Sequence, residues 1–441
     1  MNKIHYQSLF TLFVFIISNS LALSTTAVDI NDIAQSYVKL VLEIGLYEPD
    51  YAETFFGPFE WIPAEDDYEE EFPSEKLLQK IDALIESLEN AVSQDTFNAE
   101  ELQRYNFLRK QLLAVKGKID LLSDKKMSFD EESELLYDIV APAFNKEYFG
   151  KILVQFDEIL PGEGELEKRF NDYTSRFTIP GNKKESVLKA AITEYRRRIA
   201  EHIRLPENEK VDIELQFGEP WAANLQYKGN SCSVIQVNSS APFTISDLIG
   251  FASHECYPGH HIHFTMLDKN LYRQKKWVEF SIHPMNCPLA VIAEGIAEYG
   301  RRDLIISGYG LEFEKNVLFP LAGLNPNDAP IYFQVMELKD RLDEAMIEAA
   351  RRYLDGKMSR NEANEWFEKY CLVSFAGAQN LLRFIDEYRS YVVNYALGYK
   401  LVKNYIENPV WEDNSTAGRW KRFNRLLSTA ITPSELGAVN E

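Results

Sequence analysis

The chain has 441 residues, enough for two or three domains or for one large helical body. Its 47 Lys and Arg residues are outnumbered by 68 Asp and Glu residues, which gives a formal net charge of -21. Because this charge repels a phosphate backbone, we exclude nucleic acid as a partner. The four cysteines have no Cys-x-x-Cys spacing and are too few for a disulfide scaffold.

Residues 1–22 have the layout of a cleavable secretory signal. Lys3 precedes the apolar run "SLFTLFVFIIS", and small residues follow at Ser20 and Ala22. The run is shorter than the ~20 residues that a spanning helix needs, which argues against the alternative of an uncleaved anchor. We therefore expect export to the periplasm or the medium, with no stable membrane span after cleavage.

Residues 23–205 are expected to form an N-terminal helical region. Apolar residues recur in it at i, i+3, i+4 and i+7, the spacing of amphipathic helices. The segments with this pattern are residues 29–47, 74–93, 99–122 and 184–203. An acidic, aromatic loop over residues 48–73 separates the first two.

Residues 206–441 are expected to form the catalytic region. Alternating and β-branched runs over residues 211–237, with a Lys-Gly-Asn turn signal, predict a small antiparallel β-sheet. A proline and a hydroxyl cap near Thr244 then start a helix, and the chain is helical again from Pro288 onward. The predicted fold is mainly α, a large helical body with the small sheet next to that helix.

The segment "FASHECYPGHHIHF", residues 251–264, carries four of the seven histidines. In a His-Glu-x-x-His helix, residues four apart bring two imidazoles to one metal ion. Here the position four residues after His254 is Pro258, which cannot bind a metal, so a regular helix fails. Pro258 and Gly259 allow the turn to widen by a residue or two.

The widened turn predicts His254 and His260 as Zn2+ ligands, because His260 needs the smaller insertion. His261 is the second choice, and His263 is expected to be a bystander or to support a ligand. The alternative is that Pro-Gly ends the helix and leaves the histidines on a loop. Glu255, beside the first histidine, is expected to act as the general base on a water at the metal.

A third ligand is expected in "CPLAVIAEGIAEYGRRD". Glu294 lies there among apolar residues, and a bare buried carboxylate costs several kcal/mol unless a proton or a cation neutralises it. We predict Glu294 as the third zinc ligand. Glu298, one turn later, is expected either to accept the spare N–H of a ligating histidine or to pair with Arg302.

These motifs resemble the bacterial domain-of-unknown-function 885 family. The segments that carry the resemblance are "ETFFGPFEW", "HECYPGHH", "AEGIAEY" and "YRSYVVNYALGYKL", which occur in the right order over most of the mature chain. That family looks like a branch of the gluzincin metallopeptidases, with a largely helical body and a zinc cleft. The resemblance implies zinc on His254, on one of His260 and His261, and on Glu294, with Glu255 as the acid/base.

The C-terminal pattern of the family falls on Arg389, Tyr391, Tyr395 and Gly398. The resemblance implies Tyr395 as a donor to the oxyanion, and the alternative is an ordinary core tyrosine. Two departures are visible, because residues 392–394 replace the usual Pro-Gly-Gln and Lys357 stands where many members have a histidine.

The expected function is a secreted zinc-dependent hydrolase, in first place a metallopeptidase that acts on a peptide or small amide substrate. The strand "CSVIQV" is expected either to be an edge that pairs with an extended peptide or only to close the sheet. The rival functions are a zinc hydrolase of a non-peptide amide or ester, and a catalytically silent binding protein. Glu255 argues against the last, since a purely structural zinc site needs no carboxylate there.

Overall fold

The computed structural model describes residues 29–64, 68–92, 97–218 and 222–438. The expected signal, residues 1–22, lies outside these ranges. Up to the sheet, the elements are α1 (Ile30–Ile44), β1 (Thr54–Phe55), η1 (Phe59–Trp61), α2 (Ser74–Val92), α3 (Ala99–Leu122), α4 (Phe129–Tyr137), α5 (Lys146–Ile159), α6 (Leu166–Ser175), η3 (Gly181–Lys183) and α7 (Lys184–Ala200).

The middle of the chain holds the strands and the histidine-rich segment. Its elements are β2 (Lys210–Gln216), β3 (Ala223–Tyr227), β4 (Cys232–Asn238), α8 (Ile245–Gly250), η4 (Phe251–Cys256), α9 (His260–Leu267), η5 (Asp268–Gln274), η6 (Val278–Ser281), β5 (Ile282–His283), α10 (Pro288–Tyr299), η7 (Gly300–Ile306) and α11 (Ser307–Tyr309).

The remainder is helical. Its elements are η8 (Glu314–Leu318), α12 (Phe319–Ala322), η9 (Pro326–Asp328), α13 (Ala329–Asp340), α14 (Glu344–Leu354), α15 (Arg360–Tyr370), α16 (Phe375–Tyr388), η10 (Arg389–Val392), α17 (Val393–Glu407), α18 (Thr416–Leu426) and α19 (Pro433–Ala438). The prediction of a mainly α fold with a small sheet is confirmed.

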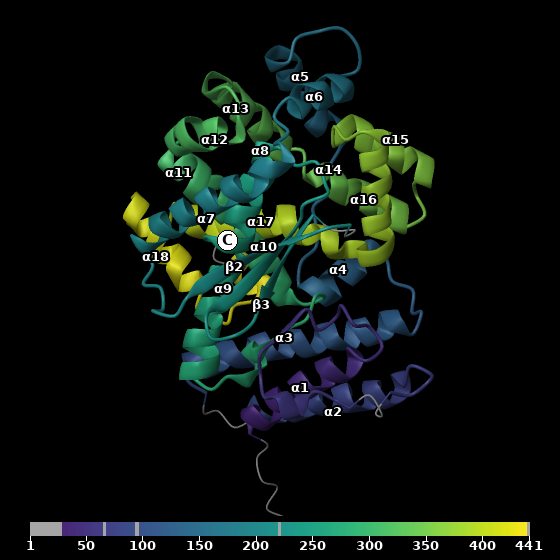
Figure 1. Cartoon of the computed structure of the whole chain (residues 1–441). Helices are drawn as coiled ribbons and strands as arrows, with labels where there is room; N and C mark the ends of the chain where they lie inside the picture. The colour runs from purple at the N-terminus through teal and green to yellow at the C-terminus, as the bar shows by residue number, and fades with distance from the viewer. Residues whose placement is uncertain (1–28, 65–67, 93–96, 219–221, 439–441) are drawn as a thin grey trace, which may run out of the picture.

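Helices α1, α2 and α3 form a layer at the bottom of Figure 1. The sequence predicted all three from their apolar spacing, and α3 begins with the capping box of Asn98 and Glu101. Their buried apolar residues form a cluster of their own, which takes in Ile282 of β5 from the rest of the chain. The layer is therefore joined to the segment that follows the histidines.

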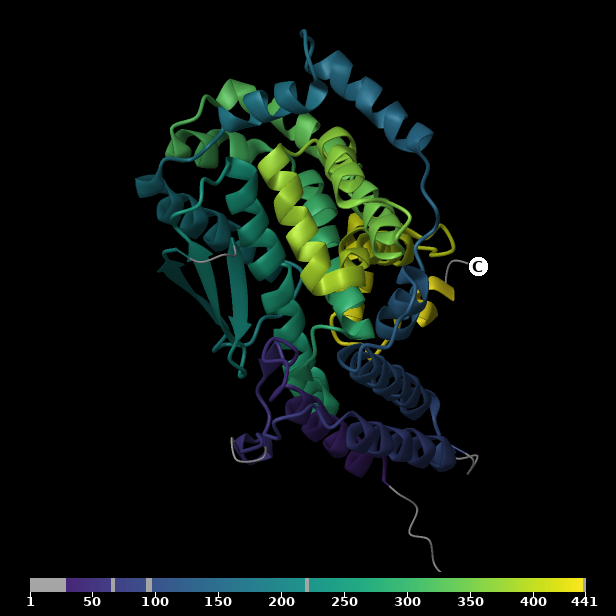
Figure 2. The ribbon, with the colours of Figure 1, turned by 90° about the vertical axis from the view of Figure 1, so that its right-hand side faces the viewer.

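The three-stranded sheet is mixed, which corrects the prediction of an antiparallel one. Its order is β2-β4-β3, with β3 and β4 antiparallel but β2 and β4 parallel. Strands joined by short connections are expected to pair in chain order, β2 with β3 and β3 with β4. Instead, β4 lies in the centre of the sheet and pairs with β2 on one side and with β3 on the other. Figure 2 shows the teal strands at the left of the molecule, beside the helical body. The crossover leaves β3 as an edge strand.

Helices α10 and α17 lie side by side in the middle of the body (Figure 1). They touch through two glycines, since a Cβ on Gly295 would lie 2.3 Å from the Gly398 carbonyl oxygen and one on Gly398 would lie 2.4 Å from the Val291 oxygen. Any side chain at either position would push the helices apart. This close contact places the segment before Gly398, which includes Tyr391, next to Glu294, the neighbour of Gly295.

The main hydrophobic cluster runs from Phe107 to Leu436. It contains residues on both sides of the expected boundary between residues 205 and 206, so the division into an N-terminal region and a catalytic region stays a prediction.

Candidate metal centre

The histidine-rich segment is a helix with a wide turn and a sharp bend. Thr244 caps α8 in a capping box with Asp247, as the sequence predicted, and the helix continues as the π-helical η4. The chain then turns back so tightly that a Cβ on Gly259 would lie 1.6 Å from the His254 carbonyl oxygen. Only glycine fits there. As a result, the rings of His254 and His260 lie 4.7 Å apart.

Glu294 on the buried helix α10 completes a cluster of three side chains. Its Oε2 lies 3.1 Å from His254 Nε2 and 3.7 Å from His260 Nε2, and one donor atom from each residue lies within 4.8 Å of the others. Two atoms that bind one tetrahedral zinc ion at about 2.0–2.2 Å lie about 3.3–3.6 Å apart. The spacing therefore suits a single ion.

The chemistry of these donors also fits a metal. Within the part of the chain that the structure describes, Glu294 Oε2 is buried and faces only the nitrogens of His254 and His260, while its Oε1 accepts from the Tyr391 hydroxyl at 3.0 Å. Burial lowers the pKa of His260 to about 4, so this imidazole is neutral at pH 7 and free to coordinate. Burial would lower the pKa of His254, but the Glu294 and Glu298 carboxylates at its two nitrogens raise it well above its usual value, so a zinc ion would take the place of the proton on Nε2. Two imidazoles and a carboxylate form a donor set that zinc prefers in catalytic sites.

His261 points away from this cluster, which corrects its place as the second choice of ligand. Its Nδ1 lies 2.8 Å from Ser233 Oγ and its Nε2 lies 2.8 Å from Glu209 Oε1. Tyr257 and Arg196 also donate to Glu209. Both imidazole nitrogens are thus used to join the bend to β4 and to the residue before β2.

The His261→Ala variant is expected to keep its metal and lose stability. The change removes two buried hydrogen bonds and a donor to a buried carboxylate, which costs about 3 kcal/mol of unfolding free energy. Urea unfolding and zinc analysis of the same sample measure the two effects, with Glu365→Ala on the exposed face of α15 as the control. Loss of zinc at unchanged stability would contradict this role.

Glu298 supports His254 from behind. Its Oε1 lies 2.8 Å from His254 Nδ1, and its Oε2 accepts from Arg301 and Arg302 at 2.8 and 2.7 Å. The two roles expected for Glu298 therefore coexist. Burial would raise the pKa of Glu298, but the two guanidinium groups hold it well below its usual range. The carboxylate stays charged and fixes the ring of His254.

Glu255 lies beside the cluster and faces the same cleft. Burial raises the pKa of Glu255 to about 7, the nearby His254 lowers it, and the Glu294 charge raises it. A carboxylate with a pKa near neutrality is suited to accept a proton and to return it.

Two tyrosines of the C-terminal pattern reach the cluster from η10 and α17. Tyr391 donates to Glu294, as given above, while the Tyr395 side chain lines the cleft at a ring distance of 5.8 Å from Tyr391. Burial, followed by the charge of Glu294, raises the pKa of both phenols, so both remain hydrogen-bond donors. Arg389 instead pairs with Glu132 of α4 and anchors η10.

The cleft over the cluster, called here the metal cleft, has a volume of about 950 Å³. Ala223, Asn224 and Leu225 of β3 form one wall, and Asn380, Arg383 and Glu387 of α16 form another. The strand beside the cleft is thus β3. The expectation that "CSVIQV" is an edge is wrong, because β4 lies between β2 and β3.

Sequence reasoning missed the pair of Glu53 and His283. The two-residue strands β1 and β5 pair with Thr54 opposite His283, and His283 Nδ1 lies 3.1 Å from Glu53 Oε2. Both residues line the metal cleft. Strands of two residues have no period to detect, so only the segment "ETFF" in the family resemblance marked this position.

His263 is buried with no hydrogen-bond partner for either nitrogen among the described residues.

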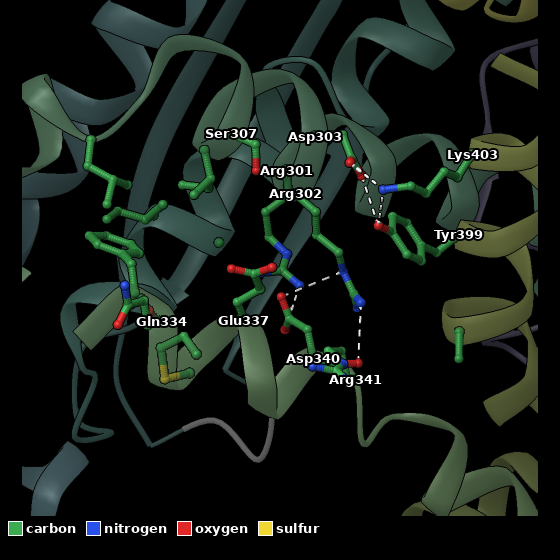
Figure 3. A pocket seen from close by; sticks show the side chains of 18 of the residues that line it. Arg301, Arg302, Asp303, Ser307, Gln334, Glu337, Asp340, Arg341, Tyr399 and Lys403 are labelled. Atoms are coloured by element: carbon green, nitrogen blue, oxygen red, sulfur yellow. Dashed lines mark hydrogen bonds and ion pairs between the residues drawn. The ribbon is translucent and has the colours of Figure 1, made fainter. Parts of the chain in front are cut away.

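Two more cavities lie along the same helices. The distal cavity, about 600 Å³, contains Arg301, Arg302, Asp340 and Phe333 but none of the predicted ligands (Figure 3). The connecting cavity, about 470 Å³, is lined by His254 and Glu255 among other residues.

No family model matches the sequence, and no curated protein matches it. Among solved structures, a "putative lipoprotein" from Colwellia psychrerythraea has the same overall fold, with a TM-score of 0.53 and 14% identity over 91% of this chain and 74% of that one. The M32 carboxypeptidase from Deinococcus radiodurans R1 is similar at a TM-score of 0.47 and 12% identity, over 93% and 97% of the two chains. A protein of unknown function from Shewanella oneidensis gives a TM-score of 0.41 and 13% identity, over 83% and 72%.

Within the described ranges, no helix has the length and apolar character that a bilayer span requires.

Proposed function

We propose that the chain is a zinc-dependent hydrolase and that it cleaves peptide bonds. The observation that carries this is the convergence of His254 Nε2, His260 Nε2 and the buried Glu294 Oε2, beside the Glu255 carboxylate. A structural zinc site needs a fourth protein ligand, whereas three ligands and an adjacent carboxylate are the composition of a hydrolytic site.

When bound, a zinc ion supplies the Lewis acidity that activates a water and polarises the scissile carbonyl. The Glu255 carboxylate takes the proton from the attacking water and returns it to the leaving amine. Its pKa of about 7 allows it to act in both directions near neutral pH. Tyr391 and Glu298 hold the carboxylate of Glu294 and the ring of His254 in place.

Tyr395 is our candidate donor to the oxyanion. Tyr395 lines the metal cleft, while the hydroxyl of Tyr391 is already used by Glu294. A neutral phenol aimed at the developing negative charge stabilises the transition state more than the substrate.

The edge of β3 supports a peptide as the substrate. Residue 222 accepts a backbone hydrogen bond from Asn238, and residue 228 donates one to Cys232. Because bonding alternates along an antiparallel pair, the N–H and C=O groups of Ala223 and Leu225 point away from β4. No other described strand pairs with them. An extended peptide can pair with this edge inside the metal cleft.

The same proposal includes membership of the domain-of-unknown-function 885 family, a gluzincin-like relationship, and export of the chain. The cluster of His254, His260 and Glu294 and the helical fold support the family relationship, while export is inferred from the sequence of residues 1–22.

Metal analysis and peptide digestion test the proposal together. The purified protein is expected to hold about one zinc ion per chain, and its hydrolysis of a mixed peptide library is expected to stop on treatment with 1,10-phenanthroline and return with added zinc. Hydrolysis that persists after the zinc has been removed would contradict the proposal. Cleavage of esters or non-peptide amides alone would favour the second kind of zinc hydrolase.

A further inference from the structure

We propose that the substrate groove crosses the metal centre, so that the enzyme cuts within a chain and not at its end. This rests on the proposed peptidase function and adds the class of substrate, an extended peptide with residues bound on both sides of the scissile bond. The three cavities described above are parts of this groove.

The cavities follow one another through shared walls. His254 and Glu255 line both the metal cleft and the connecting cavity. Gly250, Arg301 and Met336 line both the connecting and the distal cavity. The ligand His254 and the general base Glu255 therefore border both cavities. A site that trims one residue from a chain end instead needs a wall or a charged anchor next to the scissile bond, and Arg383, the guanidinium in the wall of the metal cleft, donates to Asn380.

The same two helical segments form the floor throughout. In the metal cleft the floor is His254 and Glu294, and in the connecting cavity it is Ser246 and Glu298, earlier on α8 and later on α10. From His254 back to Ser246 a helix covers about 12 Å at 1.5 Å per residue. An extended peptide needs about four residues for that length at about 3.3 Å each. The groove therefore holds about four residues on this side of the scissile bond.

The distal cavity indicates what its occupant is. One wall is apolar and includes Ile306, Leu311 and Phe333. On the charged wall, shown in Figure 3, Arg301 and Arg302 bind Asp340, and Lys403 binds Asp303. These pairs satisfy the half-buried charges of the cavity, whereas Arg341, which donates to Gln155, and Glu337 are exposed to solvent. An apolar side chain of an internal residue fits this cavity best.

Gly250 offers a clean way to close the groove. It lies at the end of α8 in an ordinary helical conformation, lines both the connecting and the distal cavity, and a Cβ placed on it meets no atom within 4 Å. A larger side chain there extends into open space of the groove without displacing the core. Gly150 on α5 is the matched control, since a Cβ on it also meets nothing within 4 Å and it lines none of the three cavities.

The experiment compares a twelve-residue peptide, acetylated and amidated at its ends, with a short two-residue reporter amide. The wild type is expected to cut the blocked peptide at internal bonds. In Gly250→Trp, the ratio of kcat/KM for the long peptide to kcat/KM for the reporter is expected to fall by about tenfold, while Gly150→Trp keeps the wild-type ratio. Gly250→Leu serves as a smaller obstruction with a smaller fall, and thermal unfolding checks that each variant is folded.

Two results overturn the inference. One is release of single residues from free-ended peptides with no cleavage of blocked ones, and the other is an unchanged ratio in folded Gly250→Trp and Gly250→Leu. Failure of the proposed function has a different signature, since wild-type protein would then hydrolyse neither substrate whatever the state of residue 250.

Discussion

The Glu255→Gln variant is expected to keep about one zinc ion per chain and to lose peptide hydrolysis by about 10²- to 10⁴-fold. The amide has the shape of the carboxyl group but cannot take a proton from water. His254, His260 and Glu294 hold the donor atoms of the site, and Glu255 is outside that set. The metal therefore stays while the chemistry stops.

Zinc content and kcat on one peptide, measured on the same sample, separate these effects. The control is Glu365→Gln, the same change on the exposed face of α15, which should leave both quantities at the wild-type level. Near-normal kcat in the Glu255→Gln variant would remove Glu255 from the mechanism. Equal loss of zinc and activity would instead mean that this residue holds the metal.

The bend of the metal helix was accessible from sequence because it follows from local rules. Pro258 blocks the usual position of the second histidine, and the Pro-Gly pair predicts a widened turn that brings His260 under His254. The structure contains that turn as the π-helical η4 and the close approach at Gly259. Glu294 was likewise visible as a carboxylate in an apolar helix, because burial of such a group requires a compensating cation.

Choosing between His260 and His261 required tertiary contacts. The two residues are neighbours in sequence, and what separates them is Glu209, which lies 52 positions from His261 and takes its Nε2. The parallel pairing of β2 was missed for the same reason. Alternation of apolar and polar residues predicts a strand, but it does not predict which strand is its neighbour. Glu53 and His283 meet only through a ladder of two residues per strand. Pairings between residues far apart in the chain produce no regular spacing of apolar residues, so the sequence does not predict them.

The Glu294→Ala variant is expected to lose zinc affinity by more than about 100-fold, a larger loss than for Glu298→Gln. Glu294 contributes a donor atom 3.1 Å from His254 Nε2, whereas Glu298 acts on the same ring from the other nitrogen at 2.8 Å. Residues that only orient a ligand cost about 10- to 100-fold in metal affinity when they are changed. Glu298→Gln keeps a hydrogen-bond acceptor, so its loss should lie near the lower end.

Competition with a chelator of known zinc affinity measures both constants, with unfolding curves taken in the absence of metal. Removal of Glu294 takes the acceptor from the buried Tyr391 hydroxyl and from His254 Nε2, so the metal-free variant is expected to be less stable than metal-free wild type by about 1–3 kcal/mol, a loss that the unfolding curves separate from the loss of zinc affinity. Equal zinc affinity in the two variants would place Glu294 behind the metal and not on it. An affinity order of wild type, then Glu298→Gln, then Glu294→Ala is what a centre built from His254, His260 and Glu294 requires.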